Sequence, residues 1–467
     1  MIKQTQLMIH QKYAVEKLLP SRIGAAFMDM GTGKTRTGIE LIYLRQNRIS
    51  NVVWFCPVSL KETIGAEILK HTDTACADIC IFDHKINIRN FTKCFWYIVG
   101  IESMSASDRI KMTANALINT SSFVIVDESS YIKGHRAART CWITDISQRA
   151  RYRLILTGTP ISQGIVDLFA QMRFLSPKIL GYNSFYSFAH NHLEYSEKYP
   201  GKIVRSHNTE YIAAKIKPYV YQVTKEECLD LPEKLYESRY FSMTREQKEL
   251  YEYAKWKFLD IDIDDWRSYT IFRLFSALQQ IVSGYWNDKD AGKLREVRHR
   301  RVETLMDTIG YIPPEKKIII WAKFEYDLEQ IKDALNEPCA LFYGKIKEKD
   351  RAKQVDFFRE EARFFLATQS CGGHGLTLNE ASYTIFYNNG FKYSERDQAE
   401  GRCHRIGQTS KVTYIDISCR DSIDTRIDNA LYMKSGLVVE FKKEVDKIKN
   451  QKGNIRNKKL KQLIEGL

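Results

Sequence analysis

A glycine-rich stretch followed by a lysine and a threonine, FMDMGTGKTRTG, occupies residues 27–38. An apolar run precedes the glycines, and apolar residues at roughly helical spacing follow them, so we expect a strand, a loop and a helix. The free N–H groups at the start of such a helix bind phosphate. Lys34 would then reach the β- and γ-phosphates, and Thr35 would ligate Mg²⁺. Because Met28 replaces the glycine of the usual pattern, a glycine turn without a ligand stays open on this stretch alone.

An acidic pair follows a second apolar run, in SSFVIVDESSYIK at residues 121–133. Carboxylates at the carboxyl end of a buried strand are costly unless something offsets their charge. A magnesium ion would do so if Asp127 held the metal, through water, and Glu128 activated an attacking water. The alternative is a pair of acids that caps the strand end. The presence of Lys34 in the same chain favours the first interpretation, which is the hydrolysis of a nucleoside triphosphate.

Two further stretches carry groups that suit the same chemistry. An apolar strand ends in the TGTP turn at residues 157–160, whose hydroxyls could relay the nucleotide state, although alone it is an ordinary turn. In QAEGRCHRIGQ, residues 398–408, Arg402 and Arg405 are three residues apart and are predicted to share a helix face. Their guanidinium groups need anionic partners. These are either surface carboxylates or the γ-phosphate of an ATP bound to the other half, as arginine fingers.

The carboxyl-terminal half repeats an α/β pattern without a phosphate loop of its own. Strand-like runs at 316–324, 362–370 and 382–389 alternate with helical segments at 325–335 and 349–360. Such alternation predicts a parallel sheet with helices on both faces. We therefore predict an α/β fold with two lobes of this kind and helical insertions between them.

The composition limits the class of protein and its partners. In 467 residues, Lys and Arg exceed Asp and Glu by 71 − 57 = 14, which indicates a polyanionic partner, most simply nucleic acid. No apolar run reaches the ~18 residues of a membrane span, and the amino terminus lacks the apolar core of a secretion signal. The ten cysteines form no C-x-x-C pair. We expect reduced thiols, no structural metal and a cytoplasmic location.

The ordered series of motifs resembles the superfamily 2 helicase core, specifically the Snf2 family of DNA-dependent ATPases, in a compact form like those of bacteria and their phages. The resemblance covers most of residues 7–425, and its most specific piece is RCHRIGQ at 402–408. The stretches that carry it are IHQKYAVEKLL (9–19), MDMGTGKT (28–35), CPVSLKETIGAEI (56–68), VDESSYIK (126–133), LTGTPISQGIVDLFAQMRFLSP (156–177), LFYGKIKEKDRAKQVDFF (341–358), LATQSCGGHGLTLNEAS (366–382) and DQAEGRCHRIGQT (397–409).

The resemblance implies two RecA-like lobes with ATP in the cleft between them. The first lobe would occupy residues 1–177 and bind ATP, and the second would occupy residues 301–440. Helical protrusions and a linker would lie at 178–300, where an amphipathic helix that buries its aromatic side chains is favoured over one that stacks on bases. A basic tail at 441–467 would be solvated and partly helical, or would contact phosphates nonspecifically.

Carried over residue by residue, the resemblance assigns an ATP site with Mg²⁺ and a DNA site. The catalytic set is Lys34, Asp127, Glu128, Arg402 and Arg405. The nucleotide-binding set is Gln11, which would read the adenine, with Gly31, Thr32, Gly33, Lys34, Thr35, Gly375 and Gln398. Thr35 and Asp127 would hold Mg²⁺. The DNA backbone would meet Ser59, Lys61, Ser103, Thr368 and Ser370, although serine and threonine at strand ends are often simple caps.

These assignments imply an ATPase that is driven by double-stranded DNA and moves along it or remodels DNA–protein complexes. Other DNA-bound proteins are further candidate partners. Efficient strand separation is not expected, since the sequence offers no wedge domain. Two alternatives stay open: a strand-separating DNA or RNA helicase, and a nucleotide-gated module that binds proteins with little turnover. Ser130 departs from the family pattern, because many relatives have histidine there.

Overall fold

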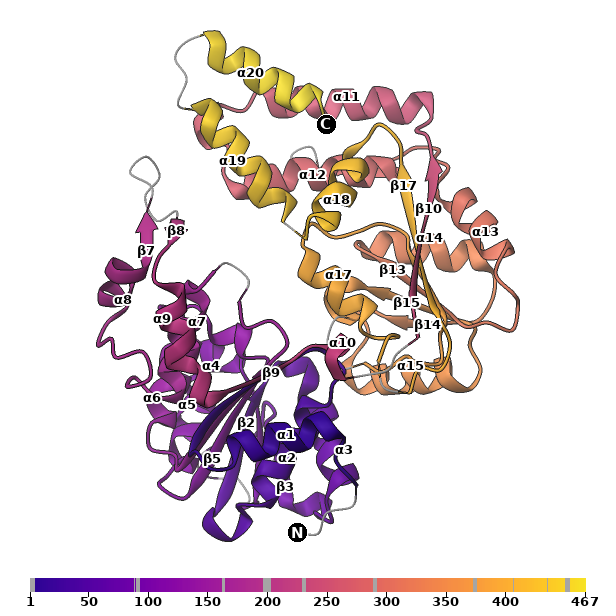
Figure 1. Ribbon diagram of the computed structural model, residues 1–467. Coiled ribbons are helices and arrows are strands. Elements are labelled where there is room, and N and C mark those ends of the chain that lie inside the picture. Colours follow the sequence, from indigo (N-terminus) through magenta and orange to yellow (C-terminus); the bar gives the residue numbers. More distant parts are fainter. Residues whose placement is uncertain are drawn as a thin grey trace. The chain divides into compact units, whose positions relative to one another are not determined.

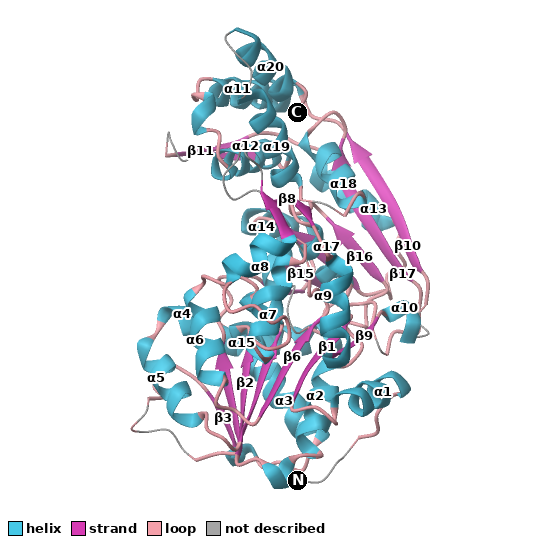
Figure 2. Ribbon diagram, turned by 60° about the vertical axis from the view of Figure 1, so that its left-hand side comes forward, coloured by secondary structure: helices cyan, strands magenta, loops and turns pink. Residues whose placement is uncertain are grey.

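The computed structural model describes residues 5–87, 89, 93–161, 164–195, 203–228, 232–288, 292–372, 376–405, 407–434, 436–449 and 454–467. The chain divides into two compact units, Met1–Asp230 and Leu231–Leu467 (Figure 1). Each unit is built on a parallel sheet with helices on both faces (Figure 2). The predicted α/β fold class is confirmed.

The first unit contains a seven-stranded sheet in the order β3-β4-β2-β5-β6-β1-β9, and every pairing in it is parallel. Its central strands are buried on both faces, which explains their continuous apolar runs. The strands are β1 (Ile23–Met28), β2 (Asn51–Cys56), β3 (Ile79–Ile81), β4 (Trp96–Gly100), β5 (Ser122–Asp127), β6 (Tyr152–Thr157) and β9 (Val220–Val223). A separate antiparallel hairpin pairs β7 (Leu193–Tyr195) with β8 (Ile203–Ser206).

Two apolar clusters cover the two faces of this sheet. Successive residues of β5 point to opposite faces, so Ile125 joins one cluster and Val126 the other. The first face packs against α1 (Ile9–Leu18), α2 (Lys34–Tyr43) and α3 (Lys61–His71). The second packs against α4 (Ser103–Ala106), α5 (Asp108–Leu117), α6 (Ala138–Ser147), α7 (Val166–Leu175), α8 (Phe185–His192) and α9 (Thr209–Ile216). The short α10 (Lys225–Cys228) follows β9.

The second unit contains a six-stranded parallel sheet in the order β10-β17-β16-β13-β15-β14. Its strands are β10 (Lys234–Phe241), β13 (Ile318–Ala322), β14 (Cys339–Phe342), β15 (Phe364–Thr368), β16 (Tyr383–Phe386) and β17 (Val412–Cys419). A hairpin pairs β11 (Tyr285–Asp288) with β12 (Lys293–Glu296). The helices are α11 (Arg245–Leu259), α12 (Ser268–Val282), α13 (Arg301–Gly310), α14 (Glu325–Leu335), α15 (Glu348–Glu360), α16 (Gln369–Gly372), α17 (Tyr393–Glu400), α18 (Ile423–Tyr432), α19 (Leu437–Lys449) and α20 (Asn454–Glu465).

The division of the chain differs from the predicted one at residues 178–300. This interval does not stand outside both sheets, because β9 completes the first sheet beside β1 and β10 completes the second beside β17. Both are edge strands, and most side chains of β10 are exposed. An edge strand lacks the continuous apolar run of a buried parallel strand, so its sequence gives little signal.

The carboxyl-terminal segment at 441–467 is packed rather than solvated, which corrects the prediction of a free basic tail. Helices α19 and α20 lie against α12 and α11 (Figure 1). Val445 and Ile464 are fully buried, and the Tyr251 hydroxyl donates a hydrogen bond of 2.9 Å to the carbonyl of Leu467. The lysines that dominate this segment lie between the apolar positions, so its partly helical character could be predicted from the sequence but its buried face could not.

A buried ion pair joins α13 to α18 and gives a prediction about stability. Arg301 is fully buried and donates to Asp424 and, at 2.9 Å, to the carbonyl of Tyr387. Arg301→Leu should lower the free energy of unfolding of the second unit by about 3–5 kcal/mol, because Asp424 would stay buried without its partner. Urea denaturation followed by circular dichroism measures this loss.

A surface ion pair in the same unit provides the control for this measurement. Arg239 donates to Glu237 in the exposed part of β10. Arg239→Leu should change the free energy of unfolding by no more than about 1 kcal/mol, since exposed pairs contribute little. Equal losses in the two variants would contradict the stabilising role of the buried pair.

All ten cysteines are free thiols. Within the described ranges, no helix is long and apolar enough to cross a membrane. Across the same residues, no group of three or more His, Cys, Asp and Glu side chains could hold a metal ion.

Candidate functional site

The glycine-rich loop lies between β1 and α2, as predicted. Gly31 and Gly33 have φ angles of 87° and 83°, in the left-handed region that favours glycine. A Cβ atom at Gly33 would lie 2.1 Å from the Gln11 amide nitrogen, so a larger residue would have to displace the Gln11 side chain and would also be strained by this φ angle. Lys34 is the first residue of α2 and donates to the carbonyls of Met28, at 2.8 Å, and Asp29, at 3.2 Å. The loop therefore has the strand–loop–helix geometry that phosphate binding requires.

The predicted nucleotide residues Gln11, Thr32 and Thr35 all lie at this loop. The Gln11 amide donates to the Thr32 carbonyl at 3.2 Å, and its oxygen accepts from the Met8 backbone at 3.0 Å. The Thr32 hydroxyl is buried and donates to the Asp29 carbonyl at 2.7 Å, whereas Thr35 is half-buried in the first turn of α2. Reading of adenine by Gln11 stays a prediction, and it would require Gln11 to exchange at least one of these hydrogen bonds.

The acidic pair stands at the carboxyl end of β5. Burial raises the pKa of Asp127 to about 6, whereas the positive charge of Lys34 acts in the opposite direction. Burial thus disfavours the charged form of Asp127, and a second cation nearby would stabilise that form. The site therefore suits Mg²⁺. Mg²⁺ usually takes only one or two carboxylates, with water and substrate phosphates as the other ligands. One carboxylate and one hydroxyl, from Asp127 and Thr35, fit that preference, and the binding of Mg²⁺ by these two residues stays a prediction.

Glu128 is held in place by two hydroxyl groups. Its backbone φ is 55°, which is strained for a residue with a side chain. The hydroxyls of Ser130, at 2.8 Å, and Thr157, at 3.1 Å, both donate to the same carboxylate oxygen, Oε1. The other oxygen has no hydrogen-bond partner among the residues that the structure describes. Glu128 is thus oriented through one oxygen and can accept a proton on the other.

The TGTP turn follows β6, which lies between β5 and β1 in the sheet, so the acidic pair, the turn and the loop meet at neighbouring strand ends. Thr157 bonds to Glu128 and also accepts a hydrogen bond of 3.1 Å from the Thr159 backbone. A Cβ atom at Gly158 would lie 3.3 Å from backbone atoms of the phosphate loop, at Met28 and Met30. The turn therefore touches both of the other two motifs, as a relay between them requires.

In the second unit, Arg402 and Arg405 converge on one backbone atom. Arg402 donates to the Leu376 carbonyl at 3.3 Å, and Arg405 donates to the same oxygen at 2.9 Å. The prediction that they share a helix face is wrong, because α17 ends at Glu400 and both arginines follow it. Gln398 is half-buried on α17, and its carbonyl accepts from Arg402 at 3.1 Å. The predicted Gly375 lies outside the described residues.

Three of the predicted DNA-binding residues gather at the carboxyl ends of β2 and β4. Ser59 is exposed in the turn after β2, Lys61 begins α3, and Ser103 begins α4 after β4. The Val58 backbone donates to Glu102 at 3.0 Å, which ties the two strand ends together. The Lys61 ammonium donates to the Phe82 carbonyl at 2.9 Å. The sheet order thus brings these three residues together, and their contact with DNA stays a prediction.

The other two predicted DNA-binding residues follow β15 in the second unit. Thr368 ends the strand, and its buried hydroxyl has no hydrogen-bond partner among the described residues. Ser370 is exposed in α16.

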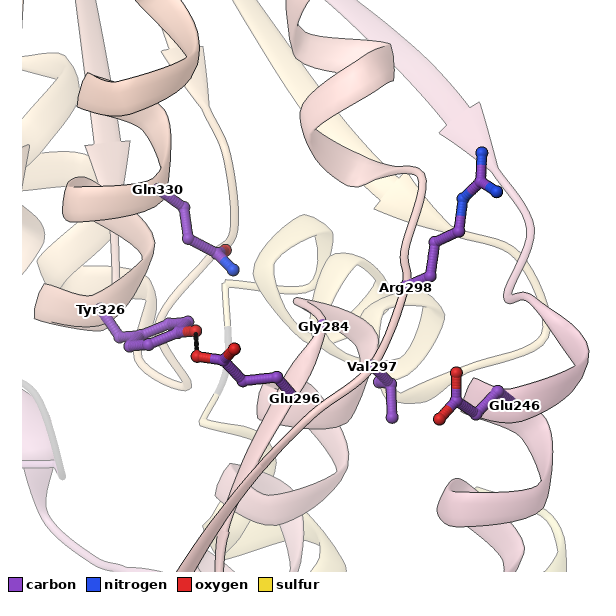
Figure 3. Close-up of a pocket in the computed structure, with 7 residues that line it drawn as sticks. All are labelled: Glu246, Gly284, Glu296, Val297, Arg298, Tyr326 and Gln330. Atoms are coloured by element: carbon purple, nitrogen blue, oxygen red, sulfur yellow. Dashed lines mark hydrogen bonds between the residues drawn. The ribbon is translucent and has the colours of Figure 1, made fainter.

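A groove elsewhere in the second unit contains none of the predicted site residues. Figure 3 shows the Tyr326 hydroxyl hydrogen-bonded to Glu296. Arg298 and Glu246 lie on the right of that view, opposite Tyr326. The groove is lined by Glu246, Gly284, Glu296, Val297, Arg298, Tyr326 and Gln330. We assign it no ligand.

Gln171 and Ser129 were not predicted as site residues, and the Ser129 hydroxyl donates to the Gln171 side-chain oxygen at 2.6 Å, next to the acidic pair. The signal that could have revealed Gln171 is a lone amide among the apolar residues of VDLFAQMRFL at 166–175. A polar side chain in a buried helix is expected to have a specific partner.

Comparison with known proteins identifies the family. The SNF2-related domain matches residues 18–285, and the helicase conserved C-terminal domain matches residues 300–407. Since the first match covers more than half of the chain, the protein belongs to the SNF2-related family, and its two units are RecA-like lobes.

Individual relatives are distant and much longer. An "Uncharacterized ATP-dependent helicase" of Mycoplasma pneumoniae is 24% identical over 68% of this chain and 30% of that protein. The human "DNA annealing helicase and endonuclease ZRANB3" is 24% identical over 91% of this chain and 39% of that protein. The chain thus spans less than half the length of these curated relatives. A solved structure, "Sulfolobus solfataricus SWI2/SNF2 ATPase core in complex with dsDNA", is 22% identical over 97% of both chains, with a TM-score of 0.44.

Proposed function

We propose that the protein is a DNA-dependent ATPase that binds magnesium ATP at the phosphate loop and uses its hydrolysis to move on double-stranded DNA or to remodel DNA–protein complexes. The observation that carries this proposal is the meeting of Lys34, the acidic pair and Thr157 at the carboxyl ends of β1, β5 and β6. The family and the charge excess of 14 support a nucleic-acid partner. A cytoplasmic location stays part of the proposal.

The polar groups of the candidate site in the first unit each have a role in the proposed reaction. Bound ATP supplies the phosphoanhydride bond that is broken. Lys34 exchanges the carbonyls of Met28 and Asp29 for phosphate oxygens, which are stronger partners for an ammonium group. Thr35 and Asp127 hold Mg²⁺. Glu128 takes the proton of the attacking water on the oxygen that Ser130 and Thr157 leave open.

We assign the response to nucleotide to the arginines of the second unit. Arg402 and Arg405 both donate to the Leu376 carbonyl, so their guanidinium groups converge. A γ-phosphate is a charged group that two converging guanidinium groups bind strongly. ATP therefore stabilises the arrangement in which these groups reach the nucleotide, and hydrolysis removes that advantage. If each lobe grips a DNA backbone in turn, the cycle produces translocation without strand separation.

The substrate is tested by comparing ATPase rates with no nucleic acid, single strands, duplex DNA and RNA. Stimulation by duplex DNA alone supports the proposal. Unwinding of a fluorescent fork would favour the helicase alternative, to which names such as "DNA annealing helicase" among the relatives point. ATP-dependent protein binding without stimulated turnover would favour the binding-module alternative.

Lys34→Ala should reduce ATP turnover by at least about 10²-fold, because a preorganised cation no longer faces the phosphates. DNA binding should stay unchanged, since Lys34 lies at the loop and not at the ends of β2 and β4. A coupled ATPase assay and duplex-binding anisotropy measure the two quantities. Lys12→Ala, on the exposed side of α1, is the control and should keep normal turnover. Normal turnover in Lys34→Ala would refute the site assignment.

A further inference from the structure

Gln171 is a buried amide that joins two turns of the candidate site. It lies on α7 with 0% exposure. Its oxygen accepts from the Ser129 hydroxyl at 2.6 Å, and its nitrogen donates to the Pro160 carbonyl at 2.8 Å and, within α7, to the Asp167 carbonyl at 2.8 Å. Every strong hydrogen-bonding group of the side chain except one lone pair is therefore used.

The two partners outside α7 are next to the reacting groups. Ser129 directly follows Glu128, and Pro160 ends the TGTP turn that begins at Thr157. Glu128 and Thr157 are themselves hydrogen-bonded at 3.1 Å. The two turns are thus connected twice, once directly in the site and once through Gln171 behind it. A shift of one turn strains both connections, so it is passed to the other turn.

The chemistry of the position favours this role over simple packing. The residues on either side of Gln171 in the chain, Ala170 and Met172, are buried. An apolar side chain of the same size as Gln171 would fill the same space. A buried amide is instead expected only where its hydrogen bonds are made, because leaving such a group unpaired costs about 1–3 kcal/mol. Here those bonds hold Ser129, the residue after Glu128. The backbone of Glu128 is strained and needs support from its surroundings.

We propose that Gln171 is a positioning residue for hydrolysis, which ties the DESS turn at 127–130 to the TGTP turn and thereby fixes Glu128 against Thr157. The role rests on the proposed ATPase function. Through this tie, any movement of the TGTP turn changes the orientation of Glu128, so the water-activating carboxylate responds to whatever contacts that turn.

Gln171→Met removes the amide and keeps the length of the side chain. The expected result is a fall in kcat of about 10- to 100-fold, the size typical of a misplaced catalytic group. The KM for ATP and the Kd of a fluorescent nucleotide should change less than twofold, because the hydrogen bonds of Gln171 to the described residues go to Ser129, Pro160 and Asp167 and not to the phosphate loop. In the nucleotide-free protein, hydrogen–deuterium exchange should become faster in peptides that contain the DESS and TGTP turns.

Ser129→Ala is a second variant, which removes the same hydrogen bond without a change in α7. It tests the positioning role even if Gln171→Met fails to fold. Ser129→Ala should lower kcat in the same direction, and the double variant should lose less than the product of the two single losses, because both remove one shared connection. Independent, multiplying losses would overturn the proposal.

Asn51 offers a matched control at the amino end of β2, in the same sheet, whereas the candidate site lies at the carboxyl ends of the strands. Its oxygen accepts from the Ser122 hydroxyl at 2.6 Å and its nitrogen donates to the Leu117 carbonyl at 3.0 Å, and it too is buried. Asn51→Leu should lower the melting temperature as Gln171→Met does, yet keep kcat within twofold.

The outcomes separate the two proposals. An active wild type with normal kcat in Gln171→Met, or an equal loss of kcat in Asn51→Leu, overturns the positioning role alone. A wild type that does not hydrolyse ATP with any nucleic acid refutes the proposed function, and the role of Gln171 in hydrolysis falls with it.

Discussion

Glu128→Gln is expected to lower the DNA-stimulated kcat by about 10²–10⁴-fold, which is the contribution of a positioned general base. The amide has the shape of the carboxylate and can still accept from Ser130 and Thr157 through its oxygen. Its nitrogen cannot take a proton from water. The chemical step therefore slows, while Lys34 and the loop keep their geometry and nucleotide affinity stays close to the wild-type value.

Single-turnover hydrolysis and nucleotide titration of Glu128→Gln separate these two effects. Glu67→Gln is a suitable control, because Glu67 pairs with His71 on α3, away from the acidic pair. The control should hydrolyse ATP at the wild-type rate. If Glu128→Gln also kept that rate, another group would have to activate the water. If it lost nucleotide affinity instead, Glu128 would belong to the binding of nucleotide and not to its hydrolysis.

The central strands could be predicted from the sequence because each is buried on both faces. The apolar run expected as a strand before the glycines is β1, and the apolar run before the acidic pair is β5. In both, burial demands apolar residues at every position, so no period is needed to recognise them. The edge strands β9 and β10 were not predicted, because one side of each faces no other strand of its sheet. Polar residues interrupt both strands, Gln222 in β9 and Glu237 to Arg239 in β10, so neither shows a continuous apolar run.

The site could be predicted as far as its groups are close in sequence or belong to a recognised motif. Lys34 and the acidic pair carry their chemistry in short stretches, and the structure places them at the ends of β1 and β5, with only β6 between these strands. The link through Gln171 could not be predicted, since its partners lie 42 and 11 residues away in the chain and meet only in the folded unit. The helix expected to carry Arg402 and Arg405 ends early at Glu400, followed by Gly401, yet the turn still directs both side chains to one carbonyl.

Arg405→Ala is expected to lower kcat by about 10³–10⁵-fold, the range of an arginine finger in phosphoryl transfer. Arg405 is the better of the two arginines to test, because Arg402 is 3% exposed and holds the carbonyl of Gln398 as well, so its loss would also disturb the fold. Arg405→Lys should restore little of the rate, since a point charge cannot replace the planar fork of donors. Nucleotide affinity should fall only slightly, because the phosphate loop belongs to the other unit.

The same measurements on Arg420→Ala control for the loss of one positive charge from the second unit, since Arg420 is exposed and contacts the Tyr240 ring. This variant should turn over ATP normally with duplex DNA. If kcat fell strongly in Arg405→Ala and stayed normal in Arg420→Ala, Arg405 of the second unit would take part in the reaction. The lysine and the acids of that reaction belong to the first unit. Wild-type turnover in Arg405→Ala would instead mean that the first unit hydrolyses ATP without this arginine, and the coupling of hydrolysis to movement on DNA would need a different origin.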